Sequence, residues 1–134
     1  MSPPPLRVEL TVEVNDAILA HLSFTNTSGE PFALYTINAC AGGRIRNNLF
    51  QIRRGEERVP YAGRLAKRPT PQAADFQVLP PGGSASATVR LDEAYTFPPG
   101  GGDYVAVYDA HNPSLGAQPL TRLRSNEQPF KVSR

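Results

Sequence analysis

Few residues in this chain combine the type and the spacing that metal binding or catalysis requires. Zinc sites in proteins are built from several Cys or His side chains at short spacing. This sequence has one cysteine, Cys40, and two histidines, His21 and His111, and it contains no His-Glu-x-x-His motif. The carboxylates also lack the spacing of a calcium-binding loop. We therefore expect no metal or other cofactor, and solvated or capping roles for both histidines.

The candidate nucleophiles also lack the neighbours that would activate them. The sequence around Ser84 and Ser86 departs from the Gly-x-Ser-x-Gly pattern of a nucleophile elbow. Cys40 is flanked by alanine and glycine, so no general base stands close to it in the sequence. The glycines at 100–102 precede an expected strand rather than a helix, which argues against a phosphate-binding loop. We predict that the chain is not an enzyme.

The most informative polar feature is a basic segment that runs from Arg44 to Arg68. It holds eight basic residues against two acidic ones, Glu56 and Glu57, and so carries +6 in a chain whose total is +2. Such a segment attracts acidic partners. We interpret it as a docking face for an acidic protein surface, with these binding residues: Arg44, Arg46, Arg64, Lys67 and Arg68. The alternative is a solvated hairpin whose arginines pair with acids elsewhere in the fold.

Nucleic acid fits this basic segment poorly, because single strands are bound by aromatic side chains interleaved with basic ones. Only Phe50 and Tyr61 interrupt the basic residues, and Phe50 is predicted to face the core. We therefore expect a protein partner and no nucleic acid.

The elements that must position these residues are short strands. Residues 6–14 alternate strictly between apolar and polar side chains, which predicts one face in the core and one in water. Residues 17–26 follow the same period of two, with Ile18, Leu22 and Phe24 facing inward. The pair Asn15 and Asp16 is typical of a turn, so the two strands should form an antiparallel hairpin.

The rest of the chain continues in this manner, because 14 prolines and 11 glycines interrupt it repeatedly and exclude a helical bundle. We predict a single helical turn within 92–97, long loops at 37–47, 62–74 and 110–126, and further strands at 32–36, 49–53, 58–61, 76–79, 85–91, 104–108 and 129–132. Strand 104–108 is apolar on both faces and should be central, whereas Pro129 suits an edge. The prediction is an all-β fold, an antiparallel two-sheet immunoglobulin-like sandwich of about eight or nine short strands.

Length and targeting signals complete this prediction. The 134 residues fit one domain, 1–134, with residues 1–5 as a flexible tail. No apolar stretch approaches the roughly 20 residues of a membrane helix. The amino terminus lacks the apolar core of a secretory signal, and a lone cysteine forms no internal disulfide. We expect a cytoplasmic protein, with a periplasmic or secreted one as the alternative if a signal was removed.

A series of turns and core aromatics follows a familiar order along residues 6–132. Its segments are TNTSGEP at 25–31, FQI at 50–52, VPYAG at 59–63, FQVLPPGGS at 76–84, LDEAYTF at 91–97 and GGDY at 101–104. The chain thus resembles the immunoglobulin-like domain that precedes the catalytic domain in the peptidyl-Lys metalloendopeptidases, which are deuterolysin-type zinc proteases. A fainter likeness, in the Asn-Thr and Pro-Gly turns and the Gly-x-Tyr strand start, links it to the intracellular proteinase inhibitor of bacilli.

The resemblance implies a propeptide-like, non-catalytic domain that accompanies a protease. The zinc-binding His-Glu-x-x-His domain of those proteases has no counterpart in this sequence, so no catalytic residue carries over. The resemblance implies a free-standing domain that binds or inhibits a protease in trans.

Three functions remain open at this point. The first is a protein-binding module, a protease inhibitor or propeptide-like partner that inserts loops 39–46 or 62–74 into a partner's cleft. The second is a structural or assembly domain that pairs through a strand edge. The third is a carbohydrate-binding module whose sugars stack on exposed tyrosines, Tyr35, Tyr61 or Tyr95. The oligomeric state is not predicted.

Overall fold

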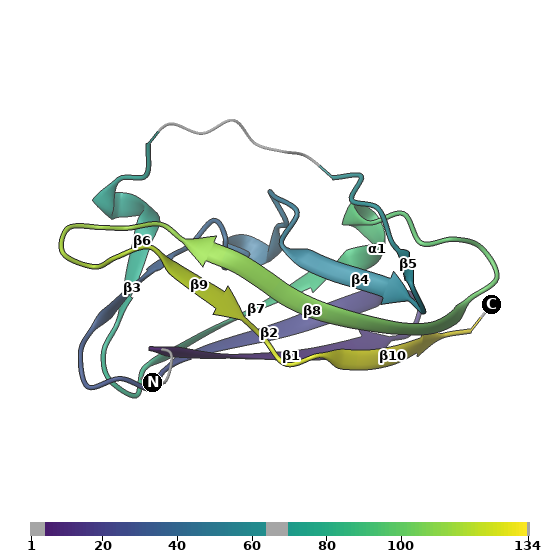
Figure 1. Cartoon of the computed structure of the whole chain (residues 1–134), viewed down its shortest axis with the longest axis horizontal. Coiled ribbons are helices and arrows are strands. Elements are labelled where there is room, and N and C mark those ends of the chain that lie inside the picture. Colours follow the sequence, from purple (N-terminus) through teal and green to yellow (C-terminus); the bar gives the residue numbers. More distant parts are fainter. Residues whose placement is uncertain (1–4, 64–69, 134) are drawn as a thin grey trace.

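The computed structural model describes residues 5–63 and 70–133, and most of these residues lie in antiparallel strands (Figure 1). No helix among the described residues is long and apolar enough to cross a membrane. The strands are β1 (Leu6–Val14), β2 (Ile18–Asn26), β3 (Phe32–Tyr35), β4 (Phe50–Arg54), β5 (Glu57–Arg58), β6 (Phe76–Leu79), β7 (Ser84–Arg90), β8 (Gly102–Asn112), β9 (Thr121–Arg124) and β10 (Gln128–Val132). The all-β prediction is confirmed.

The first sheet contains β1, β2 and β7 in that order, and its hairpin is the predicted one. β1 pairs with β2 antiparallel over its whole length, from Leu6 opposite Asn26 to Val14 opposite Ile18. The inward side chains at both ends of this register are buried or half-buried, because their alternation matches the pleat of the strands. Among residues 1–5, the first four lie outside the described residues, and the Pro5 carbonyl accepts a hydrogen bond from the Thr27 amide.

The second sheet has the order β10-β8-β4-β5, and β9 also pairs with β8. β8 is central as predicted, but it runs to Asn112 rather than ending at Tyr108. The long loop expected at 110–126 was therefore wrong in part, since it also contains β9. Thr121–Arg124 is a four-residue strand with two arginines, and it is held by pairing with β8 rather than by an apolar pattern.

Several boundaries differ from the sequence prediction for local reasons. β5 is only two residues long instead of spanning 58–61, and Pro60, which has no amide N–H, follows it closely. Tyr61 instead forms an isolated bridge with Tyr95. The predicted helical turn is present as α1 (Leu91–Ala94). The loop after β3 contains a short 3-10 helix, η1 (Ala41–Gly43).

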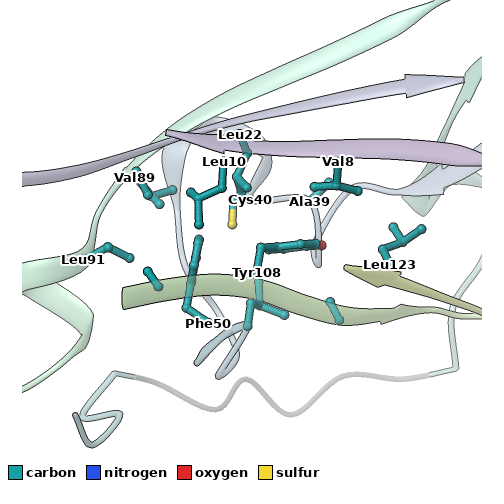
Figure 2. Close-up of a cluster of buried hydrophobic side chains, with 14 of the residues drawn as sticks. Val8, Leu10, Leu22, Ala39, Cys40, Phe50, Val89, Leu91, Tyr108 and Leu123 are labelled. Carbon is teal, nitrogen blue, oxygen red and sulfur yellow. The ribbon is translucent and has the colours of Figure 1, made fainter. Parts of the chain in front are cut away.

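The two larger sheets lie face to face across a core built around Tyr108 (Figure 2). The Tyr108 ring of β8 meets the Phe24 ring of β2 edge-on, with 5.5 Å between centroids, and the Phe50 ring of β4 at 5.7 Å. Edge-to-face packing of this kind is favourable beyond the apolar area that it buries. One aromatic residue thus joins strands of both sheets in a sandwich-like arrangement.

A third, two-stranded sheet of β3 and β6 is joined to the second sheet by side-chain amides rather than by a strand. The Tyr35 amide N–H donates to Asn112 Oδ1 at 2.7 Å, and Asn112 Nδ2 donates to the Ala33 carbonyl at 3.0 Å. Gln118 repeats this pattern on Ala33, because its amide both accepts from the N–H and donates to the carbonyl. Asn112 is 1% exposed, so water cannot replace it.

Replacing Asn112 with alanine should therefore destabilise the protein by roughly 2 kcal/mol, because it leaves the buried Tyr35 N–H unpaired and removes one of the two donors to the Ala33 carbonyl. Urea unfolding of the Asn112→Ala variant measures this loss. Gln51→Ala is the control, since the exposed Gln51 makes only a 3.5 Å contact to Asp109. Equal unfolding midpoints for the two variants would contradict this account of how β3 is attached.

A second prediction concerns Asp109 of β8, whose carboxylate accepts hydrogen bonds from Arg122 at 2.9 and 2.5 Å and from Arg124 at 2.9 Å. The bond from Arg122 holds the pKa of Asp109 below its usual value. A lowered pKa in the folded state stabilises the protein above the unfolded carboxyl pKa of about 4, and this contribution disappears as pH falls through the folded value. Asp109→Asn should lower the thermal midpoint at neutral pH and have progressively less effect in acid. A difference that is independent of pH would refute this.

Candidate protein-binding site

Two of the five predicted binding residues, Arg44 and Arg46, are exposed on the loop between η1 and β4. Arg64, Lys67 and Arg68 lie outside the described residues. Of the predicted docking face, the structure therefore describes the amino-terminal part, with Arg44 and Arg46.

The loop that carries Arg44 and Arg46 is anchored to β8 at its base. The Tyr108 hydroxyl donates to the Asn38 carbonyl, and Asn38 Nδ2 donates to the His111 carbonyl at 2.8 Å. Asn47, on the far side of the arginines, donates to Asn38 Oδ1 at 3.0 Å. Both ends of the loop are thus tied to one point, which restricts the positions of the two arginines between them.

Cys40 and Ile45 add packing to these polar anchors. Cys40 is fully buried, and Figure 2 shows its sulfur among core side chains that include Leu10 and Leu22. Its backbone has φ of 59°, a left-handed conformation that costs energy for a residue with a Cβ and persists where the surrounding structure enforces it. Ile45, between the two arginines, packs against the core. The apolar side chains therefore face inward while the arginines face solvent.

Arg44 and Arg46 share a hollow of about 710 Å³ with Arg90 and Glu93. Arg90 ends β7, and Glu93 lies in α1, so the hollow is formed by segments far apart in the sequence. The Arg90 guanidinium contacts Asp92 at 2.6 Å and Glu93 at 3.3 Å. Its hydrogen bond to Asp92 keeps the pKa of that carboxyl low. Sequence reasoning missed Arg90 because it lies outside the basic segment and next to two acids.

Three further arginines of the basic segment that the structure describes, Arg53, Arg54 and Arg58, lie elsewhere, on the β4–β5 hairpin. Arg54 contacts Glu57 at 2.9 Å and donates to the Gly101 carbonyl at 3.0 Å. Arg53 lies 4.0 Å from Glu127. These two residues agree with the alternative interpretation, in which arginines pair with acids of the same fold. The described arginines of the basic segment are thus divided between the β4–β5 hairpin and the loop of Arg44 and Arg46.

The residues considered for catalysis or metal binding do not come together. His21 contacts Thr88 Oγ1 at 2.9 Å and Glu13 Oε1 at 3.0 Å on the outer face of the first sheet. His111 is exposed and lies in β8 rather than in the loop expected at 110–126. Within residues 5–63 and 70–133, no three His, Cys, Asp or Glu side chains gather in a group that could hold a metal ion.

Two of the tyrosines considered for sugar stacking were wrongly expected to be exposed. Tyr35 and Tyr95 are 4% and 3% exposed. Tyr95 is held inside by its hydroxyl, which accepts from the Phe50 amide at 2.9 Å and donates to Asn48 Oδ1 at 2.8 Å. Tyr61 is half-buried against the Tyr95 ring, with 5.2 Å between centroids. The stacking surface expected for a carbohydrate-binding module therefore lacks two of its three rings.

A scan against protein families found none that matches this chain. A search of curated proteins also found no match. The interpretation of the site therefore rests on the geometry described above.

Burial raises the pKa of the Cys40 thiol to about 12, which predicts an inert cysteine. A thiolate is the reactive form, so at about pH 8 an aromatic disulfide reagent should label the folded protein negligibly. The chain unfolded in guanidinium chloride should release one equivalent of chromophore, because it has one cysteine. Rapid labelling of the folded protein, at a rate independent of denaturant, would show that the loop opens and is not anchored as described.

Proposed function

We propose that this protein is a non-catalytic protein-binding module that uses the loop of Arg44 and Arg46 to bind an acidic segment of a partner protein. The observation that carries the proposal is the hollow that both arginines line together with Arg90 and with Glu93, a carboxylate that Arg90 already binds. Arginine forms bidentate hydrogen bonds with carboxylates. A set of guanidinium groups around one hollow therefore favours Asp and Glu side chains over neutral ones.

The proposal includes an immunoglobulin-like two-sheet sandwich as the fold. The facing antiparallel sheets β1-β2-β7 and β10-β8-β4-β5 support it, as do the passages of the chain from the first sheet to the second, from β2 through β3 to β4 and from β7 to β8. In such sandwiches the loops at the ends are presented by a rigid frame and carry the binding residues.

The partner that we propose is a protease, which the module inhibits or accompanies as a propeptide would. The family resemblance suggests this class of partner, and the anchored loop supports the mechanism. A loop that is already held in one conformation loses little entropy when it enters a cleft. Inhibition would then be occlusion, with Arg44 and Arg46 pairing with acidic residues at the rim of the protease cleft.

Reversing the two charges should strongly reduce capture of the partner. The tagged wild-type protein and an Arg44→Glu/Arg46→Glu variant are incubated with lysate and culture supernatant at low and physiological salt, and bound proteins are identified by mass spectrometry. We expect a protease that forms a one-to-one complex with the intact wild-type chain, and about tenfold less of it on the variant, since attraction becomes repulsion.

The control is an Arg7→Glu/Lys131→Glu variant, which changes the net charge equally at exposed positions on β1 and β10. It should capture the same protease as the wild type. Equal loss with both variants would mean that total charge, and not the Arg44 loop, determines binding. Undiminished capture by Arg44→Glu/Arg46→Glu would refute the proposed function.

A further inference from the structure

The outer edge of β7 has backbone groups that point away from the first sheet. The Gly83 carbonyl accepts from the Asn26 amide at 2.9 Å, so Gly83 faces β2. Backbone groups alternate sides along an antiparallel strand, and the register with β2 therefore turns the N–H and C=O of Ser84 and Ser86 outward. The Thr88 carbonyl also points outward, towards Gly43. Gly43 lies so close to this edge that a Cβ added to it would be 3.1 Å from the Thr88 carbonyl oxygen.

The Ser84 end of this edge is open. Both serines are exposed, and no other backbone or side-chain group of residues 5–63 and 70–133 forms a hydrogen bond with their outward N–H or C=O. At the other end η1 packs beside Thr88. A strand added to this edge would therefore form backbone hydrogen bonds with Ser84 and Ser86. It would then continue alongside η1, where the exposed residues Gly42 and Gly43 have no side chains.

Other edges in the described part of the chain carry devices that block strand addition. β10 contains Pro129 and Lys131, which are typical of protected edges. The outer edge of β1 is occupied where Asn126 bonds both the N–H and the C=O of Leu10. β5 is two residues long and charged. β7, by contrast, has neither proline nor charge before Arg90, and its outward side chains there are small hydroxyls.

The basic hollow lies at the carboxyl end of this edge, because Arg90 is both the last residue of β7 and part of the hollow. All pairings between named strands in the described structure are antiparallel. A strand added antiparallel to β7 runs from the Arg90 end towards Ser84. The residues that precede its paired part therefore lie beside Arg44, Arg46 and Arg90.

We propose that the protein partner adds an extended strand to the edge of β7, and that acidic residues immediately precede this strand in the partner's sequence. This inference rests on the proposed function, because the acidic residues bind the same hollow. It specifies the partner further: an extended segment with Asp or Glu at its amino-terminal end and β-branched residues, which favour extended backbone, after it.

The test uses two labelled peptides of identical composition and fluorescence anisotropy as the readout. One has the order Asp-Glu-Asp-Val-Thr-Val-Thr, and the other has the reverse order. We expect the acid-first peptide to bind at least about tenfold more tightly than the acid-last one, as antiparallel pairing requires. Equal affinities, or tighter binding of the acid-last peptide, would overturn the proposed direction.

The protein variants Ser86→Pro and Ser86→Ala separate backbone pairing from side-chain contact. Proline removes the outward N–H of residue 86 without removing a hydrogen bond to β2, whereas alanine keeps that N–H. We expect Ser86→Pro to weaken binding about tenfold or more and Ser86→Ala to change it less than about twofold. Circular dichroism checks that both variants fold. Equal binding by the two variants would overturn the strand-addition proposal.

Three further measurements test pairing at the β7 edge. If Ser86→Pro does not fold, peptides N-methylated at alternate residues replace it: one set should lose binding and the other should keep it, and equal binding refutes pairing. Loss of binding in Arg44→Glu/Arg46→Glu alone would overturn strand addition while leaving the proposed function intact. Sedimentation that shows a wild-type dimer, absent in Ser86→Pro, would assign the edge to a second copy of this chain and overturn the peptide partner.

Discussion

The strands of this protein are short and its sheets are small, so some backbone N–H and C=O groups have no neighbouring strand to pair with. The need to satisfy these groups by other means is the central constraint on the structure. Side-chain amides satisfy these groups, since an amide carries the same donor and acceptor as a peptide bond. Asn112 and Gln118 do so for β3, Asn126 does so for β1, and Asn26 donates to the carbonyls of Glu30 and Leu79. The small β3–β6 sheet is attached to the second sheet in this way.

One residue, Tyr108, connects the core to the candidate site. Tyr108 packs between the sheets through its ring, while its hydroxyl bonds the loop that carries Arg44 and Arg46. The loop is therefore held by the residue that holds the sheets together. A binding surface built on such a loop is preorganised, which suits a module that acts by occlusion rather than by chemistry. The buried, protonated thiol of Cys40 contributes packing to this loop and no reactivity.

Charge and hydrogen-bonding capacity are distributed unevenly over the molecule. Arg54 of the β4–β5 hairpin contacts Glu57, and Arg122 and Arg124 of β9 contact Asp109. Arg44 and Arg46 lie on one hollow beside the end of β7, whose outer backbone groups at Ser84 and Ser86 point to solvent. The arginine-lined hollow and the outward backbone groups of the β7 edge are therefore adjacent. This adjacency links the proposed acidic partner to the proposed strand addition.

Local patterns in the sequence are sufficient to predict the β-hairpin of β1 and β2, the central position of β8 and the edge position of β10, because period-two alternation and proline act locally. The sequence also singled out Arg44 and Arg46. Tertiary structure alone decided that Tyr35 and Tyr95 are buried, that β9 forms, and that Arg90 joins the two arginines. Those outcomes depend on contacts between residues far apart in the chain, such as Asp109 with Arg122 and Asn112 with β3. A local pattern does not encode such contacts, since it specifies which face of a strand is buried but not what lies against it.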